Sequence, residues 1–160
     1  MCSSDLALAR RRGLAFVVAG DGRAAARLRA QGLHRREAAM RPGWPRLRAG
    51  ADAGAGAGAL APPGGWRTAS AHGVAGLVAA RRARAHLVFV GPVFTTASHP
   101  GAPALGRVRL GLMLRSARTA RPGPAVAALG GMNPARFRTL RGLGIAAWGG
   151  IDAFAPRPSR

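Results

Sequence analysis

The chain has 160 residues, of which 48% are hydrophobic, and its net charge is +20. This length suits one domain with a hydrophobic core, but it is short for a closed barrel of eight βα units, which needs about 200 to 250 residues. No apolar run approaches the ~18 residues of a membrane helix, and the first twelve residues lack the pattern of a secretory signal. A single cysteine, Cys2, excludes an internal disulfide and a multi-cysteine zinc site, and we expect a cytoplasmic protein.

The 25 basic residues are all arginine, and lysine is absent. A charge of this size attracts polyanions, so nucleic acid binding is one hypothesis. However, the arginines are spread along the chain, mostly on predicted helices, and only 5% of the residues are aromatic, too few for a base-stacking platform. The sequence contains no helix-turn-helix, zinc-finger or RNA-binding motif. Nucleic acid binding is therefore the third and least favoured hypothesis.

The first part of the chain predicts two strands and two helices. A helix ending at residue 12 leads into an apolar, valine-rich strand over 14–19, which stops at a glycine-containing turn. A helix rich in alanine and arginine over 23–30 and a short strand over 32–34 follow. Residues 41–65 consist mainly of Gly, Ala and Pro without periodicity, which predicts a flexible loop.

Strands and helices alternate again after this loop. The pattern predicts strands over 67–70, 86–90, 125–129 and 145–149, helices over 73–83, 108–119 and 134–141, and a tail over 156–160. Six strands that alternate with helices predict an α/β fold with a parallel sheet. We expect an incomplete TIM (β/α)8-barrel type of fold, in one domain over 1–155.

Two glycine pairs follow predicted strands near the end of the chain. Gly130 and Gly131 precede a predicted helix, and Gly149 and Gly150 follow the last strand. Glycine lets backbone N–H groups approach an anion, and phosphate often binds after the last two strands of a barrel. Each pair alone is a weak signal that favours a structural turn, whereas the two pairs together, in this order, favour a phosphate site.

Polar residues follow two other strands. Thr96, Ser98 and His99 share the loop after strand 86–90, where hydroxyl and imidazole groups can bind phosphate oxygens; an ordinary polar loop is the alternative. Ser70 and His72 follow strand 67–70 and could orient a leaving group, with a helix cap as an equal alternative. The sequence reveals no acidic partner for this histidine, which argues against a nucleophilic triad.

Three further residues complete the candidates. Asp21 is the carboxylate at a strand end in the first half of the chain, and it could ligate Mg²⁺. A lone aspartate is more often a turn or cap residue. We predict structural roles for His34 and His86.

Three blocks carry a resemblance to a known family: Ser70-Ala71-His72, then Gly91-Pro92-Val93-Phe94 with Thr96 and Ser98, then Gly130-Gly131-Met132. In this order they resemble the thiamine phosphate synthase/TenI family, with the order of elements matching over 9–154. Members of that family are (β/α)8 barrels, and its synthases join hydroxymethylpyrimidine diphosphate to thiazole phosphate with Mg²⁺ and release pyrophosphate. The resemblance implies a thiamine phosphate synthase-like protein of thiamine biosynthesis. The alternative is a TenI-like or degenerate, non-catalytic binder of thiazole phosphate.

The resemblance also assigns roles to residues. Ser70 matches a serine near the pyrimidine diphosphate and is the candidate catalytic residue, and Asp21 matches an acidic residue near the metal. Thr96 and Ser98 match the hydroxyls that hold the thiazole phosphate. Gly131 and Ile151 match its backbone contacts. The full predicted substrate-binding set is Thr96, Ser98, His99, Gly130, Gly131, Gly150 and Ile151.

The chain departs from the family pattern mainly around the diphosphate. Gly20 replaces one acid of a paired Asp-Asp, and Ala39 stands where a second metal-ligating Asp is expected. His99 replaces a lysine that contacts diphosphate, and Asp152 replaces a phosphate-binding serine. We count six of the family's eight strands and expect the first two βα units, with their basic diphosphate-binding segment, to be missing. The chain is therefore expected to keep the thiazole phosphate half of the site better than the diphosphate half.

Overall fold

Six parallel strands pair side by side in chain order to form the sheet. The computed structural model describes residues 3–40, 65–96, 101, 103–117 and 122–150. The strands are β1 (Val17–Ala19), β2 (Gly32–Arg35), β3 (Trp66–Ala71), β4 (Leu87–Val90), β5 (Ala125–Ala128) and β6 (Ala147–Trp148). The predicted parallel α/β fold with six strands is confirmed. The predicted loop over 41–65, apart from Gly65, and the predicted tail lie outside the described residues.

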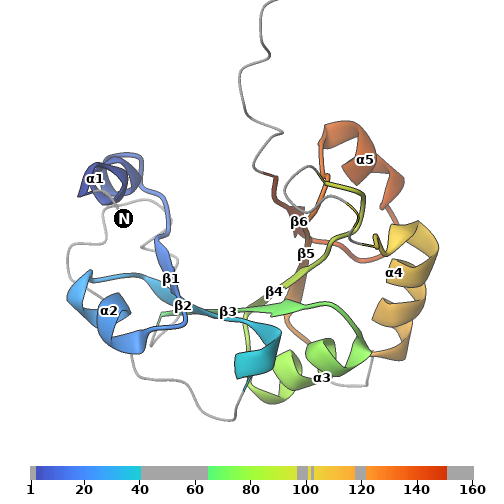
Figure 1. Cartoon of the computed structure of the whole chain (residues 1–160), viewed down its shortest axis with the longest axis horizontal. Helices are drawn as coiled ribbons and strands as arrows, with labels where there is room; N and C mark the ends of the chain where they lie inside the picture. Colours follow the sequence, from blue (N-terminus) through green and yellow to red (C-terminus); the bar gives the residue numbers. More distant parts are fainter. Residues whose placement is uncertain (1–2, 41–64, 97–100, 102, 118–121, 151–160) are drawn as a thin grey trace, which may run out of the picture.

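Helices connect the strands and lie on the outer side of the curved sheet (Figure 1). They are α1 (Ser3–Arg11), α2 (Gly22–Arg27), the short 3-10 helix η1 (Glu37–Ala39), α3 (Val74–Arg82), α4 (Gly106–Ser116) and α5 (Pro134–Thr139). No helix in the described ranges has the length and apolar character needed to cross a membrane.

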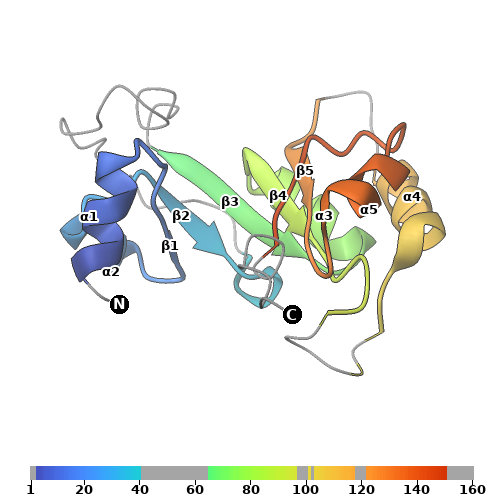
Figure 2. The same cartoon turned by 90° about the horizontal axis from the view of Figure 1, so that it is seen from above.

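The sheet is an open arc. Among the described residues, β1 pairs with β2 and β6 pairs with β5, and β1 and β6 are not paired with each other. Figure 1 shows these two strands on opposite sides of the arc, and Figure 2 shows the same arrangement from above. Because all strands run in the same direction, their carboxyl ends meet along one edge, which we call the carboxyl edge. Barrels of this type carry their chemistry at that edge.

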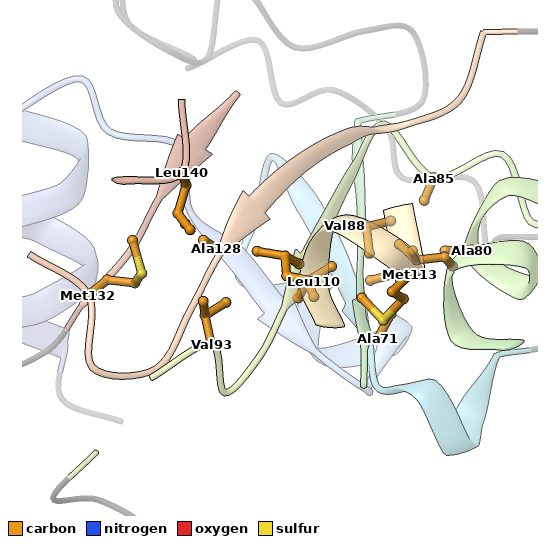
Figure 3. Packing of buried hydrophobic residues seen from close by; sticks show 13 residues of the cluster. Ala71, Ala80, Ala85, Val88, Val93, Leu110, Met113, Ala128, Met132 and Leu140 are labelled. Atoms are coloured by element: carbon orange, nitrogen blue, oxygen red, sulfur yellow. The ribbon is translucent and has the colours of Figure 1, made fainter. Parts of the chain in front are cut away.

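The main core lies between the sheet and helices α3, α4 and α5. Alternate residues of a strand point to opposite faces, and the buried alanines and valines of β3, β4 and β5 point towards these helices. Helix α4 contributes Leu110 and Met113, which are three residues apart and therefore share one helix face. Leu110 and Leu140 are the largest fully buried side chains of the described chain. Figure 3 shows Leu110 close to Val93, Val88 and Ala128.

A smaller, separate cluster supports the first two strands. It consists of the buried Ala25, Ala30 and Leu33, with Phe16 and Val18 packed against them. Two of its three buried residues are alanines, so it buries much less apolar surface than the main core. The β1–β2 side of the sheet is therefore the less strongly stabilised side.

The edge strands are shorter than the sequence predicts. Strand β1 begins at Val17 rather than at residue 14, because its partner β2 begins at Gly32, which pairs with Val17. Leu14 is 58% exposed and contributes no strand packing. Strand β6 has two residues because only two positions of β5 pair with it. An edge strand has a neighbour on one side only, so the extent of pairing with that neighbour sets its length.

Candidate functional site

The loops after β4 and β5 bind each other through backbone hydrogen bonds at the carboxyl edge. The Val93 amide donates to the Leu129 carbonyl at 2.8 Å, and the Phe94 amide donates to the Gly130 carbonyl at 3.1 Å. We call residues 91–96 and 129–131 together the loop pair. Its two halves come from neighbouring strands, so the described part of the predicted hydroxyl loop, which ends at Thr96, lies beside the first predicted glycine pair.

Both glycines of the loop pair have a conformation and surroundings that exclude a side chain. Gly130 has φ +85° and Gly131 has φ +58°, a region that favours glycine. A Cβ on Gly130 would lie 2.6 Å from Pro92 Cα, and one on Gly131 would overlap the Thr95 carbonyl oxygen. The glycines therefore let the two loops approach to backbone contact. Their predicted role in binding an anion stays a prediction.

Arg136 places a guanidinium group beside these glycines. It lies in α5, where the Asn133 side chain caps the helix by accepting from the Arg136 amide at 2.8 Å. Its Nη1 donates to the Gly131 carbonyl, and its guanidinium carbon lies 5.1 Å from the centre of the Phe94 ring. Arg136 was not among the residues predicted from the sequence. An arginine three residues after a capping asparagine, just past a glycine pair, was the available signal.

The second glycine pair lies next to the first. The Gly149 amide donates to the Ala128 carbonyl at 3.0 Å, and a Cβ on Gly149 would lie 2.8 Å from Leu129 Cδ2. Gly150 is the next residue in the chain and therefore lies close to the loop pair. Thr96 is half-buried at the end of the described part of its loop. The other predicted substrate-binding residues, Ser98, His99 and Ile151, lie outside the described residues.

Ser70 belongs to a second group of polar residues, at the end of β3. Its Oγ accepts a hydrogen bond from the Glu37 amide at 3.2 Å. Glu37 Oε2 accepts from the His72 amide at 2.7 Å and lies 2.8 Å from His72 Nδ1. We call Ser70, His72 and Glu37 the β3 cluster. It lies at the carboxyl edge, as predicted for Ser70.

The expectation that His72 has no acidic partner was wrong. Glu37 lies 35 residues earlier in the sequence, but the parallel pairing of β2 with β3 brings the residues that follow β2 beside the end of β3. No hydrogen bond between Ser70 and His72 is found among the described residues. A nucleophilic triad is therefore still not supported, because Ser70 and His72 are not joined by a hydrogen bond in the described part of the chain, even though His72 has an acidic partner.

Asp21 acts as a helix cap. Its Oδ1 accepts from the amides of Arg23 at 2.8 Å and Ala24 at 3.2 Å, so it occupies the N-cap position of α2. Within the described ranges no three His, Cys, Asp or Glu side chains come together to hold a metal ion. Mg²⁺ is usually bound through one or two carboxylates together with substrate phosphates, and the Asp21 carboxylate accepts two backbone amides as the helix cap. The metal-binding role of Asp21 stays a prediction.

His34 and His86 have structural surroundings. His34 Nδ1 lies 3.0 Å from Thr68 Oγ1, and its ring centre is 5.8 Å from that of Phe89. Burial, and then the positive charge of Arg36, lower the pKa of His34 below its ordinary value of 6.5. Burial and then Arg67 lower the pKa of His86 in the same way. In both rings these surroundings disfavour the charged form.

The β3 cluster and the loop pair are neighbours along the carboxyl edge. Only β4 separates β3 from β5, which corresponds to about 10 Å between the two strand ends at a strand spacing of about 4.8 Å. Asp21, by contrast, follows β1, and three strands lie between β1 and β5. The two groups of residues therefore lie about two strand spacings apart along this edge.

Comparisons with known proteins agree with the resemblance seen in the sequence. The family model described as thiamine monophosphate synthase matches residues 2–154. Among solved structures, thiamine phosphate pyrophosphorylase from Pyrococcus furiosus has a similar fold, with a TM-score of 0.59 and 20% sequence identity. The likeness covers 91% of this chain but 61% of that one, so this chain spans about three fifths of the length of that protein. No curated protein matches the sequence. Because the family model covers nearly the whole chain, this protein belongs to the thiamine monophosphate synthase/TenI family.

Proposed function

We propose that this chain binds thiazole phosphate at the loop pair and joins it to hydroxymethylpyrimidine diphosphate, with release of pyrophosphate. One observation carries the proposal: two neighbouring loops at the carboxyl edge make backbone contact at glycines that exclude a side chain. Arg136 adds a fixed positive charge beside those glycines. Family membership supports the choice of phosphorylated thiamine precursors as ligands.

The two groups of residues have separate tasks in this reaction. The loop pair holds the phosphate of the thiazole, with backbone amides and the Arg136 guanidinium as donors. Ser70, at the carboxyl end of β3, contacts the pyrimidine diphosphate in this proposal. The diphosphate leaves with the electron pair of the broken C–O bond, and the thiazole nitrogen then attacks the pyrimidine cation. Holding both substrates in this arrangement lowers the entropic part of the barrier.

The second candidate is a thiazole phosphate binder that does not catalyse the transfer. Asp21 favours this candidate, because its carboxylate caps α2 and no cluster of three potential metal ligands is found among the described residues. The two candidates share the loop pair and differ in the diphosphate half of the site. They therefore predict the same affinity for thiazole phosphate and different turnover.

Two assays on the same purified chain test both candidates. Calorimetry measures binding of thiazole phosphate, and a product assay measures formation of thiamine phosphate when the pyrimidine diphosphate and Mg²⁺ are added. Binding with turnover supports the synthase. Binding without turnover supports the binder, and absence of thiazole phosphate binding would contradict both.

A further inference from the structure

A single carboxylate oxygen holds both the backbone and the ring of His72. Glu37 Oε2 accepts from the His72 amide at 2.7 Å and lies 2.8 Å from its Nδ1. A carboxylate accepts hydrogen bonds and does not donate them, so Nδ1 carries the hydrogen in this contact. This contact orients the ring and leaves Nε2 as the second ring nitrogen. Among the described residues, Nε2 has no hydrogen-bond partner.

Two other elements hold the Glu37 carboxylate in place. Its own backbone amide donates to Ser70 Oγ at 3.2 Å, which ties η1 to the end of β3. On α3, Gly76 is buried against it, and a Cβ at this position would overlap Glu37 Oε1 and lie 2.5 Å from Cδ. A glycine at residue 76 therefore leaves the space that the carboxylate occupies. Helix α3 thus packs against the carboxylate side of the contact, while the histidine side is exposed.

The His72 ring is accessible. Its side chain is 65% exposed, whereas that of Glu37 is 30% exposed. Arg35 and Arg36 immediately precede Glu37 in the sequence, and a positively charged segment favours the approach of anions. The contact lies at the edge where barrels bind their ligands.

We propose that His72 contacts the diphosphate of the pyrimidine substrate through Nε2, and that Glu37 is the positioning residue that holds the ring. This inference rests on the proposed function and assigns a contact for the diphosphate half of its site. When the C–O bond breaks, its electron pair stays on the diphosphate oxygen. A ring with hydrogens on both nitrogens donates from Nε2 to the diphosphate while Glu37 balances its charge at Nδ1. No atom of His72 is transferred.

The ring nitrogens of His72 give a direct readout. The full chain, labelled with ¹⁵N in histidine, is titrated with inorganic pyrophosphate at one fixed pH near neutrality. We expect the His72 Nε2 resonance to move on saturation while those of His34 and His86 stay in place. In Glu37→Gln, we expect the Nδ1 and Nε2 shifts to change before any ligand is added, because the carboxylate no longer sets which nitrogen carries the hydrogen. A His72 Nε2 resonance that is unmoved at saturation would overturn the inference.

The affinities for pyrophosphate and for thiazole phosphate distinguish a failure of this inference from a failure of the proposed function. For His72→Gln we expect pyrophosphate to bind about tenfold more weakly, the usual effect of losing a hydrogen bond from a charged donor. Arg82→Gln removes one positive charge at the far end of α3 and serves as the matched control, with an unchanged affinity. Thiazole phosphate affinity is measured on the same samples. If the unaltered chain binds thiazole phosphate but not pyrophosphate, the inference fails and the non-catalytic binder is the candidate that stands. If His72→Gln binds pyrophosphate normally, the inference fails and the proposed function stands. If thiazole phosphate does not bind, the proposed function fails as well.

Discussion

The Arg136 side chain is held beside the loop pair by several contacts. Its guanidinium lies between the Gly131 carbonyl and the Phe94 ring, and its backbone amide is bound by the Asn133 cap. These contacts fix the direction of a long side chain that would otherwise lose rotamer entropy on binding a ligand. A pre-positioned guanidinium suits a phosphate, which it can bind with two parallel hydrogen bonds.

We predict that Arg136→Gln binds thiazole phosphate about tenfold more weakly, since a hydrogen bond from a charged donor is worth about 1.5 to 3 kcal/mol. Arg138→Gln is the control, because Arg138 is exposed on the same helix. Calorimetry on both variants checks the prediction. Equal losses of affinity would show that the overall positive charge, rather than the position of Arg136, attracts the ligand.

His34 links stability to pH. Its pKa lies below the ordinary value because burial and Arg36 disfavour the charged ring. The unfolded chain therefore binds a proton at His34 at higher pH than the folded chain does. The stability associated with the neutral ring is present above pH 6.5 and is lost as the pH falls from 6.5 towards the lower folded value.

Chemical denaturation at a series of pH values tests this linkage. We expect the free energy of unfolding to decrease below pH 6.5, and to decrease less steeply in His34→Gln, which has no titrating ring. A His34→Gln variant with the same pH dependence as the original chain would place the effect elsewhere, with His86 as the first alternative since burial lowers its pKa in the same direction.

At the scale of elements, α4 covers the sheet through one face only. Leu110 is fully buried, whereas Leu112, two residues later, is 61% exposed. Residues two apart on a helix point in different directions, so the same residue type has opposite surroundings on the same helix. We predict that Leu110→Ala destabilises the fold by about 2 to 5 kcal/mol, and Leu112→Ala by less than about 1 kcal/mol. Thermal unfolding of the two variants measures the difference, and similar losses would contradict the packing of α4 described above.

The sequence predicted the order of elements well and their ends less well. The valine-rich run before Gly20 and the apolar run before Gly91 both indicate buried strands. Both are found as strands, but β4 alternates buried and half-buried residues, whereas β1 is half-buried to exposed because it lies at the edge of the sheet. Helix α2 ends at Arg27 rather than at residue 30 because Arg29 has φ +48°, a left-handed conformation that ends the helix. Periodicity does not signal such a residue, because arginine itself favours helices.

The parts of the candidate site that lie within one loop could be predicted from the sequence. The contacts between two loops could not. Gly130 and Gly131 are adjacent in the sequence, so their pairing and their place after a strand are visible without a structure. The contact of Glu37 with His72 joins loops 35 residues apart, and it depends on the register of β2 against β3. No local pattern encodes that register, which is why the carboxylate was missed.

At the scale of the whole molecule, the open sheet should be unevenly stable. Strands β3 and β4 have partners on both sides and lie over the main core, whereas β1 and β6 have one partner each among the described residues. We predict that backbone amides of β3 and β4 exchange slowest in hydrogen–deuterium exchange, and those of β1 and β6 fastest. Protection of β1 equal to that of β3 would instead indicate that its outer edge is paired in solution.

The central claim is that the loop pair binds the phosphate of the thiazole. It is tested most directly by the thiazole phosphate dissociation constant of Gly131→Ala against that of Gly142→Ala. Both glycines have positive φ, at +58° and +84°, so both substitutions strain the backbone. A Cβ on Gly131 would enter the loop pair, whereas one on Gly142 meets nothing within 4 Å. The account predicts a loss of affinity of at least about tenfold for Gly131→Ala and little change for Gly142→Ala. Unaltered binding by a folded Gly131→Ala variant would contradict it.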